Sequence, residues 1–220
     1  MSSWSFLFDF DGTISPLDMG HVIFDAFAGP GWREIDEEWI RGDIATSERA
    51  RRQFELVSTD EQTLLNLVDK HEVDPGFGPL LADLRASGVD VQIVSDGFDI
   101  YVGRMLVKAG LSDVPMHTNH LEFRDGSIVL GFPHERPGHD LRGGWKGDVV
   151  RDVVTAGRRV AYAGDGMSDL SAARSANLLF ARDSLAICCD AEGIPYHSFS
   201  CMQGIHRWVR RNPFGHAVVE

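Results

Sequence analysis

The sequence has few cysteines, no long apolar run and no excess of positive charge. Its three cysteines, two of them adjacent, form no disulfide framework, which favours a reducing compartment such as the cytoplasm. No stretch approaches the ~20 apolar residues of a membrane-spanning helix, and the first residues lack a signal-peptide pattern. The formal net charge of −12 argues against nucleic acid or an anionic membrane as partner. We therefore expect a cytoplasmic protein that binds neither.

What the sequence does contain is an alternation of short β-type runs with helical patterns. The runs at residues 4–10, 89–95, 158–164 and 177–181 each end in a polar or glycine-containing turn, and a helical pattern follows most of them. This alternation predicts an α/β fold: a Rossmann-like parallel sheet flanked by helices on both faces. Ligands of such sheets bind beyond the carboxyl ends of the strands, where these turns lie.

Two segments depart from the alternation. Residues 16–75 hold no convincing strand, and their apolar residues recur at helical spacing, which predicts a small helical cap inserted after the first strand. Residues 121–132 contain Asp-Gly between two apolar runs, which predicts a β-hairpin flap. The predicted organisation is an α/β catalytic core of residues 1–15 and 76–220 with a cap of residues 16–75.

Acidic residues end two of the predicted strands. Asp9 and Asp11 close the run FLFDF, and residues i and i+2 of an extended strand point to the same face. Taken alone, this pair fits a solvated Asp-Gly turn equally well. Asp165 ends another run, with Asp169 four residues later. Carboxylates gathered at one edge repel one another unless a cation lies among them, and oxygen ligands without cysteine or histidine favour Mg²⁺.

An anion site is predicted beside these acids. Ser95 ends the second strand, and its hydroxyl, with the N–H groups of Asp96 and Gly97 near the start of the next helix, forms a cradle for an anion. A plain helix cap is the alternative for this segment. Lys146 opens another helix, where a cation opposes the helix dipole unless it reaches toward a bound phosphate. A solvated surface lysine is the alternative there.

The order of these segments resembles the four motifs of the haloacid dehalogenase superfamily. DFDGT resembles the first motif, IVSDG the second and GDGMSD the fourth, and Lys146 lies where the third has its lysine. The helical cap resembles that of the phosphoserine-phosphatase-like branch. Three further stretches are similar to the methionine-salvage phosphatases that act on hydroxy-keto-methylthiopentenyl phosphate: FPH (132–134), LLFARDSL (178–185) and IPYHSF (194–199).

The resemblance implies a Mg²⁺-dependent phosphatase of a small phosphorylated metabolite, acting through an aspartyl-phosphate. It makes Asp9 the nucleophile and Asp11 the acid and base that serves the leaving oxygen and then the water. Asp9, the backbone carbonyl of Asp11 and Asp165 would hold the metal, with Asp169 in support. The phosphate oxygens would be bound by Ser95, Asp96, Gly97 and Lys146.

Selectivity is expected to come from the cap, because the sheet-edge residues contact only metal and phosphate. Asp18 resembles an acidic substrate-contacting residue of the phosphoserine phosphatases, and Arg52 the arginine that binds a substrate carboxylate. A surface charge is the alternative for each. His134, His139 and Asp140 follow the hairpin, and their irregular spacing favours a solvated flap over a second metal site.

Other functions remain open alongside the phosphatase. A phosphoserine phosphatase or a phosphotransferase to a second alcohol would use the same residues. A dehalogenase would need neither Asp11 nor the metal, so the aspartate pair disfavours it. A catalytically silent module that binds phosphorylated metabolites is the non-enzyme alternative, although no catalytic group is missing from the motifs.

Overall fold

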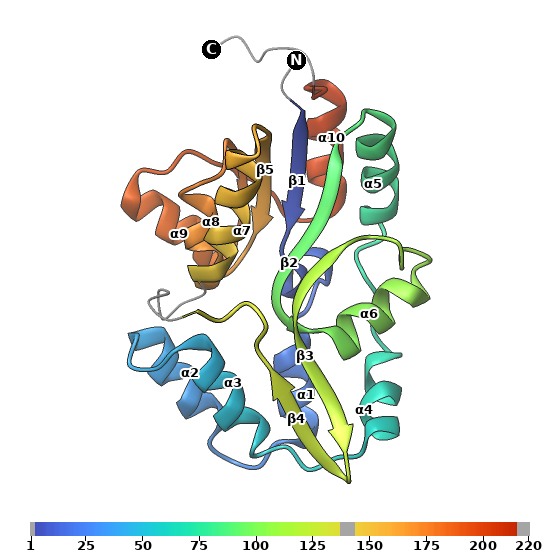
Figure 1. The fold of residues 1–220 in the computed structure, drawn as a ribbon, viewed down its shortest axis with the longest axis vertical. Coiled ribbons are helices and arrows are strands. Elements are labelled where there is room, and N and C mark those ends of the chain that lie inside the picture. The colour runs from blue at the N-terminus through green and yellow to red at the C-terminus, as the bar shows by residue number, and fades with distance from the viewer. Residues whose placement is uncertain (1–2, 137–143, 215–220) are drawn as a thin grey trace.

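The computed structural model describes residues 3–136 and 144–214 (Figure 1). Within them the strands form a sheet in the order β4-β3-β2-β1-β5-β6-β7, in which all neighbours are parallel except β3 and β4. This confirms the predicted α/β class. The strands are β1 (Trp4–Phe8), β2 (Asp90–Phe98), β3 (Met116–Arg124), β4 (Ser127–Gly131), β5 (Arg159–Gly164), β6 (Leu178–Ala181) and β7 (His197–Ser198).

Helices cover both faces of the sheet, which explains why its strands are apolar on both sides. In β1, Phe6 and Phe8 belong to one buried cluster and Leu7 to another. The first cluster includes α5 (Phe77–Ala86), α6 (Asp99–Lys108) and α10 (Met202–Arg211). The second includes α7 (Gly144–Thr155), α8 (Leu170–Ala173) and α9 (Asp183–Glu192). Among the described residues, no helix is long and apolar enough to span a membrane.

The segment predicted to form a cap is helical. It contains α1 (Met19–Phe27), α2 (Trp32–Arg41), α3 (Thr46–Phe54) and α4 (Glu61–Val68), which lie beyond the carboxyl ends of β1 and β2 (Figure 1). The chain leaves and re-enters the core at adjacent points, because the backbone N–H of Asp74 donates to the carbonyl of Ile14 at 2.8 Å. The exact division into core and cap stays a prediction.

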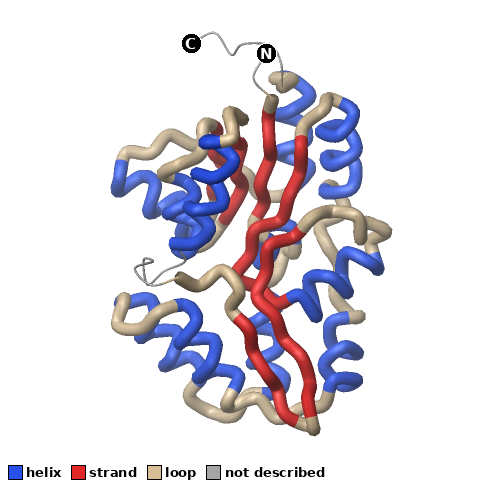
Figure 2. Tube along the Cα trace, in the orientation of Figure 1, coloured by secondary structure: helices blue, strands red, loops and turns tan. Residues whose placement is uncertain are grey.

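The predicted hairpin is present and is shifted by one residue, over 120–131 instead of 121–132. Strands β3 and β4 pair antiparallel from His120–Gly131 to Arg124–Ser127. Asp125 and Gly126 both have positive φ, at 52° and 78°, which suits a two-residue turn. The hairpin extends past the parallel sheet to the level of the cap helices (Figure 2).

Candidate active site

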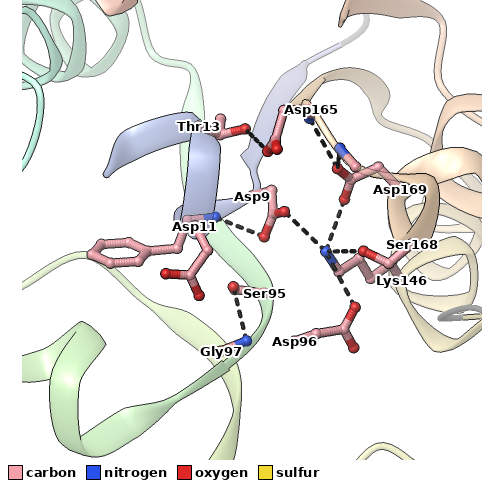
Figure 3. A network of polar contacts seen from close by, with 12 residues as sticks. Asp9, Asp11, Thr13, Ser95, Asp96, Gly97, Lys146, Asp165, Ser168 and Asp169 are labelled. Carbon is pink, nitrogen blue, oxygen red and sulfur yellow. Dashed lines mark hydrogen bonds and ion pairs between the residues drawn. The ribbon is translucent and has the colours of Figure 1, made fainter. Parts of the chain in front are cut away.

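The carboxyl ends of β1, β2 and β5 bring the predicted catalytic segments to one edge of the sheet (Figure 3). Asp9 follows β1 directly, and its backbone N–H donates to the carbonyl of Ala163 in β5 at 2.9 Å. Its Oδ1 accepts from the backbone N–H of Phe10 at 2.7 Å, and its Oδ2 lies 3.1 Å from Nζ of Lys146. The side chain of Asp9 is therefore buried and held in one orientation.

The turn after Asp9 packs tightly against the acidic segment after β5. Gly12 has a φ of +69°, and a Cβ there would lie 2.3 Å from Oδ2 of Asp165. The hydroxyl of Thr13 donates to Oδ1 of the same carboxylate at 2.8 Å. Glycine and threonine of the DFDGT motif therefore place Asp165 next to Asp9.

Three carboxylates lie close enough together to hold a metal ion. Asp9, Asp165 and Asp169 each offer a ligand atom, and these atoms lie within 4.8 Å of one another. Burial and the charge of Asp169 raise the pKa of Asp9 well above its usual range and that of Asp165 to about 7. A cation among these oxygens would relieve the repulsion that raises both values. The donor set is oxygen only, so the residues fit a hard cation such as Mg²⁺.

Asp169 differs from the other two carboxylates in its contacts. It is fully buried, and its Oδ2 accepts from the backbone N–H groups of Asp165 and Gly166 at 3.1 and 3.0 Å. Its Oδ1 accepts from the hydroxyl of Tyr162 at 2.7 Å and from Nζ of Lys146 at 2.8 Å. With four donors already bound, this carboxylate holds its neighbours in place, which favours the supporting role that the motif resemblance implies.

Lys146 places a buried ammonium group in the middle of the acids. Its Nζ lies 2.8 Å from Asp169, 3.1 Å from Asp9 and 3.4 Å from Asp96 (Figure 3). Burial lowers the pKa of Lys146, but the carboxylates of Asp169 and Asp9 outweigh this effect and hold the pKa well above its usual value. The solvated surface position considered for this lysine is therefore wrong.

The segment predicted as an anion cradle differs in detail. Strand β2 continues to Phe98, so Asp96 and Gly97 are extended and do not begin a helix. The backbone N–H of Gly97 is not free, because it donates to the hydroxyl oxygen of Ser95 at 3.1 Å. The side-chain amide of Asn119 in β3 donates to the carbonyl of Asp96 at 2.8 Å and ties this stretch to β3, although the strand pairing is irregular between Val94 and Phe98. The Ser95 hydroxyl proton remains able to contact a phosphate oxygen.

Residues 6–174 match the family model described as "haloacid dehalogenase-like hydrolase". The chain belongs to this family. Two curated relatives named 2-hydroxy-3-keto-5-methylthiopentenyl-1-phosphate phosphatase, from Brevibacillus brevis and Exiguobacterium sibiricum, are each 28% identical to the chain. Their alignments cover 92% and 90% of this chain and 93% of each relative.

Solved structures with the same fold include two phosphoserine phosphatases. The "Phospho-Aspartyl Intermediate Analogue of Phosphoserine phosphatase" has a TM-score of 0.75 at 20% identity, covering 94% of this chain and 99% of that one. A substrate-bound phosphoserine phosphatase complex has a TM-score of 0.72 at 19% identity, covering 96% and 98%. The family and fold expected from the four motifs are thereby confirmed.

In this haloacid dehalogenase-like hydrolase, a cavity of about 260 Å³ extends from the sheet edge to the cap. The sheet side contributes both aspartates of the first motif, the Ser95 segment, Lys146 and Asp165. The cap side contributes apolar residues such as Phe24 and Trp39 and a set of polar residues: Asp18, His21, Asp36, Arg49 and Gln53.

The polar residues of the cap are tied together around Asp36. Its carboxylate accepts from the side chain of Gln53 at 2.9 Å, pairs with the His21 ring at 2.8 Å and lies 3.4 Å from Arg49. The hydrogen bond to Asp36 raises the pKa of His21. Asp18, predicted to contact substrate, also lines the cavity, and its Oδ1 caps α1 by accepting from the backbone N–H of His21 at 2.9 Å.

Arg52 is not among the residues that line the cavity. Its guanidinium forms a two-bond contact with Glu38, at 2.6 and 2.9 Å. Arg49, three residues earlier on α3, lines the cavity and stacks on the ring of Trp39 at 4.2 Å. The structure therefore places Arg49, which the sequence analysis missed, where Arg52 was expected.

The described part of the flap contacts both the core and the cap. His134 stacks on Trp145 at the start of α7, with ring centroids 4.6 Å apart. Glu135 binds the cap helix α3 through the hydroxyl of Ser47 and through Arg51, the latter at 3.0 Å. His139 and Asp140 lie outside the described residues, so their predicted place in a solvated flap stays a prediction.

Proposed function

We propose that this protein is a Mg²⁺-dependent phosphatase that hydrolyses a phosphomonoester of a small metabolite through an aspartyl-phosphate. The observation that carries the proposal is the position of Asp9. Its buried carboxylate is one of the oxygen ligands suited to a metal, and it also lies 3.1 Å from the ammonium of Lys146. A carboxylate in that setting can attack a phosphorus atom whose negative oxygens are neutralised on two sides.

The residues account for both halves of the reaction. A carboxylate oxygen of Asp9 bonds to phosphorus as the bond to the leaving oxygen breaks, and Asp11 gives its proton to that oxygen. Asp11 then takes a proton from water, which attacks the phosphorus and frees Asp9 and inorganic phosphate. Burial and the charge of Asp18 raise the pKa of Asp11 to about 7, so that both protonation states are accessible near neutral pH.

The remaining residues of the edge would bind the transferred group. Lys146 and the Ser95 hydroxyl would contact phosphate oxygens, where charge spreads during the transfer. Mg²⁺ would be held by Asp9, the carbonyl of Asp11 and Asp165, and when bound it neutralises phosphate charge and orients the ester. Asp169 holds Lys146 and the backbone at Asp165 in position through its hydrogen bonds to both.

The names of the relatives suggest the substrate. The curated relatives point to the methionine-salvage enol phosphate, 2-hydroxy-3-keto-5-methylthiopentenyl-1-phosphate, and the structural relatives to phosphoserine. The cavity joins the acidic edge of the sheet to polar residues of the cap, an arrangement that suits a small phosphorylated metabolite of either kind. A direct test is release of inorganic phosphate from para-nitrophenyl phosphate with Mg²⁺, followed by a panel of phosphorylated metabolites that includes both.

Two outcomes of this assay would contradict the proposal. No release of phosphate from any ester would favour the silent binding module. Transfer of most of the phosphate to an added alcohol, instead of to water, would favour a phosphotransferase.

We predict that Arg49, more than Arg52, sets the affinity for the metabolite. Arg49→Ala removes a cation from the cavity wall and is expected to raise KM for the best metabolite at least about tenfold. The KM for para-nitrophenyl phosphate, whose small ring is expected to contact the cap little, should change by less than about threefold. Arg52→Ala is the matched control on the same helix, and its half-buried pair with Glu38, which lies outside the cavity lining, predicts little effect on either substrate. A selective rise in KM for Arg52→Ala alone would restore the sequence-based assignment.

A further inference from the structure

Tyr101 is a buried tyrosine whose hydroxyl contacts the proposed acid and base. It lies on α6, is 2% exposed, and donates to Oδ2 of Asp11 at 2.7 Å. A buried tyrosine hydroxyl needs a hydrogen-bond partner, and among the described residues Asp11 is the partner of this one. A tyrosine hydroxyl ordinarily ionises only at about pH 10, so it is a donor at neutral pH.

The second oxygen of Asp11 is held from the cap. Its Oδ1 accepts from the backbone N–H of Met19, the first residue of α1, at 2.9 Å. The carboxylate is therefore fixed between a helix of the core and a helix of the cap. Each oxygen accepts one such bond, and a carboxylate has about four acceptor positions, so positions remain for the proton that catalysis moves.

The glycine of the second motif makes room for this contact. A Cβ on Gly97 would lie 2.5 Å from both Oδ2 of Asp11 and the hydroxyl oxygen of Tyr101. Real Cβ atoms do not approach other atoms so closely, so a larger residue at position 97 would displace the tyrosine hydroxyl, the carboxylate or both. The segment assigned to phosphate binding thus also shapes the place where Tyr101 meets Asp11.

We propose that Tyr101 is a positioning residue that aims Asp11 at the leaving-group oxygen. The inference rests on the proposed phosphatase function. Proton transfer requires Asp11 to lie within hydrogen-bond reach of the leaving oxygen, and a carboxylate held by one donor can turn about its side-chain bonds. Tyr101 supplies the second donor, from helix α6.

The test compares esters whose leaving groups differ in their need for a proton. Tyr101→Phe removes one oxygen atom and leaves the ring. We expect kcat/KM for the best alkyl phosphate to fall by about tenfold to a hundredfold, a part of what general acid catalysis supplies. For para-nitrophenyl phosphate, whose phenolate leaves without a proton, kcat/KM should stay within about twofold. This parameter covers only the steps up to loss of the leaving group, so the later hydrolysis of the intermediate does not affect it.

Tyr196→Phe is the matched control. Its hydroxyl contacts Asp190 on α9, and neither residue lines the cavity. This variant should retain the kcat/KM of the wild type for both esters. Thermal melting of both variants would separate a loss of folding from a loss of positioning.

A double-mutant comparison tests whether Tyr101 acts through Asp11. In Asp11→Asn protein the acid is already missing, so adding Tyr101→Phe should lower alkyl phosphate turnover by less than about twofold more. Equal losses on both esters, an unchanged alkyl ester, or a full additional loss in the Asp11→Asn background would each overturn the inference. If the wild type hydrolyses neither ester, the proposed function itself fails, which is a distinct result.

Discussion

Asp9→Asn is expected to reduce phosphate release from every ester to background, a loss of at least about four orders of magnitude in kcat. Asparagine keeps the size of the side chain and can accept the bond from the N–H of Phe10, but its amide cannot attack phosphorus. Losses of this size follow when an essential nucleophile is removed. The measurement is steady-state turnover of para-nitrophenyl phosphate by purified protein. Appreciable turnover by Asp9→Asn would contradict the covalent route.

The fold of the Asp9→Asn variant should remain intact. Burial and neighbouring acids raise the pKa of Asp9, so a neutral amide removes an unfavourable buried charge. Lys146 keeps its contact with Asp169 at 2.8 Å. We expect a melting temperature in metal-free buffer equal to or slightly above that of the wild type. Asp113→Asn, on a side chain that is 69% exposed and distant from the cavity lining, controls for the loss of one surface charge and should retain full turnover.

The fold could be predicted because burial and spacing leave few alternatives for its core. Strands covered on both faces appear as continuous apolar runs, and four of those runs coincide with β1, β2, β5 and β6. The Asp-Gly pair fixes the hairpin through its two positive φ angles. The two-residue strand β7 carries no such signal, because it is too short to show a period.

The acidic edge of the sheet could be predicted because its residues directly follow the ends of strands in the sequence. A carboxylate at the end of a buried strand is costly without a cation, so its position signals a function. The burial of Lys146 also follows from this, since three carboxylates compensate its charge. The hydrogen bond from Gly97 to Ser95 could not be foreseen, because strand β2 extends past the motif only through its pairing with β3.

The cap residues were harder to assign because three arginines lie close together on one helix. Ala50 and Phe54 are the buried face of α3, and Arg49 lies beside this face, whereas Arg52 lies on the side of Glu48 and Glu55. That pattern is present in the sequence and would have favoured Arg49. The role of Tyr101 could not be predicted from the sequence either. A tyrosine on the apolar side of a helix indicates packing until the partner of its hydroxyl is known.

Removal of divalent metal is expected to abolish turnover, and Mg²⁺ should restore it. The carboxylates of Asp9 and Asp165 repel each other and the phosphate of an incoming ester when no cation is bound. Ca²⁺ should bind but not support turnover, since it accepts more ligands at longer distances and can engage both oxygens of Asp9. The measurement is phosphate release after exhaustive EDTA treatment, then after addition of each metal. Full activity in EDTA would refute the site.

The same site predicts how metal binding depends on pH, with a readout that does not require activity. In the metal-free protein the pKa of Asp165 is about 7, above the value near 3.9 of an unfolded aspartate. The folded state therefore binds more protons between about pH 4 and 7, and stability falls as pH rises through this window. Mg²⁺ binds the ionised carboxylates, so it should raise the melting temperature more at pH 8 than at pH 5.

In Asp165→Asn protein most of this difference between the two pH values should disappear. An Mg²⁺ effect that is equal at the two pH values, or that survives in Asp165→Asn, would mean that the metal binds elsewhere.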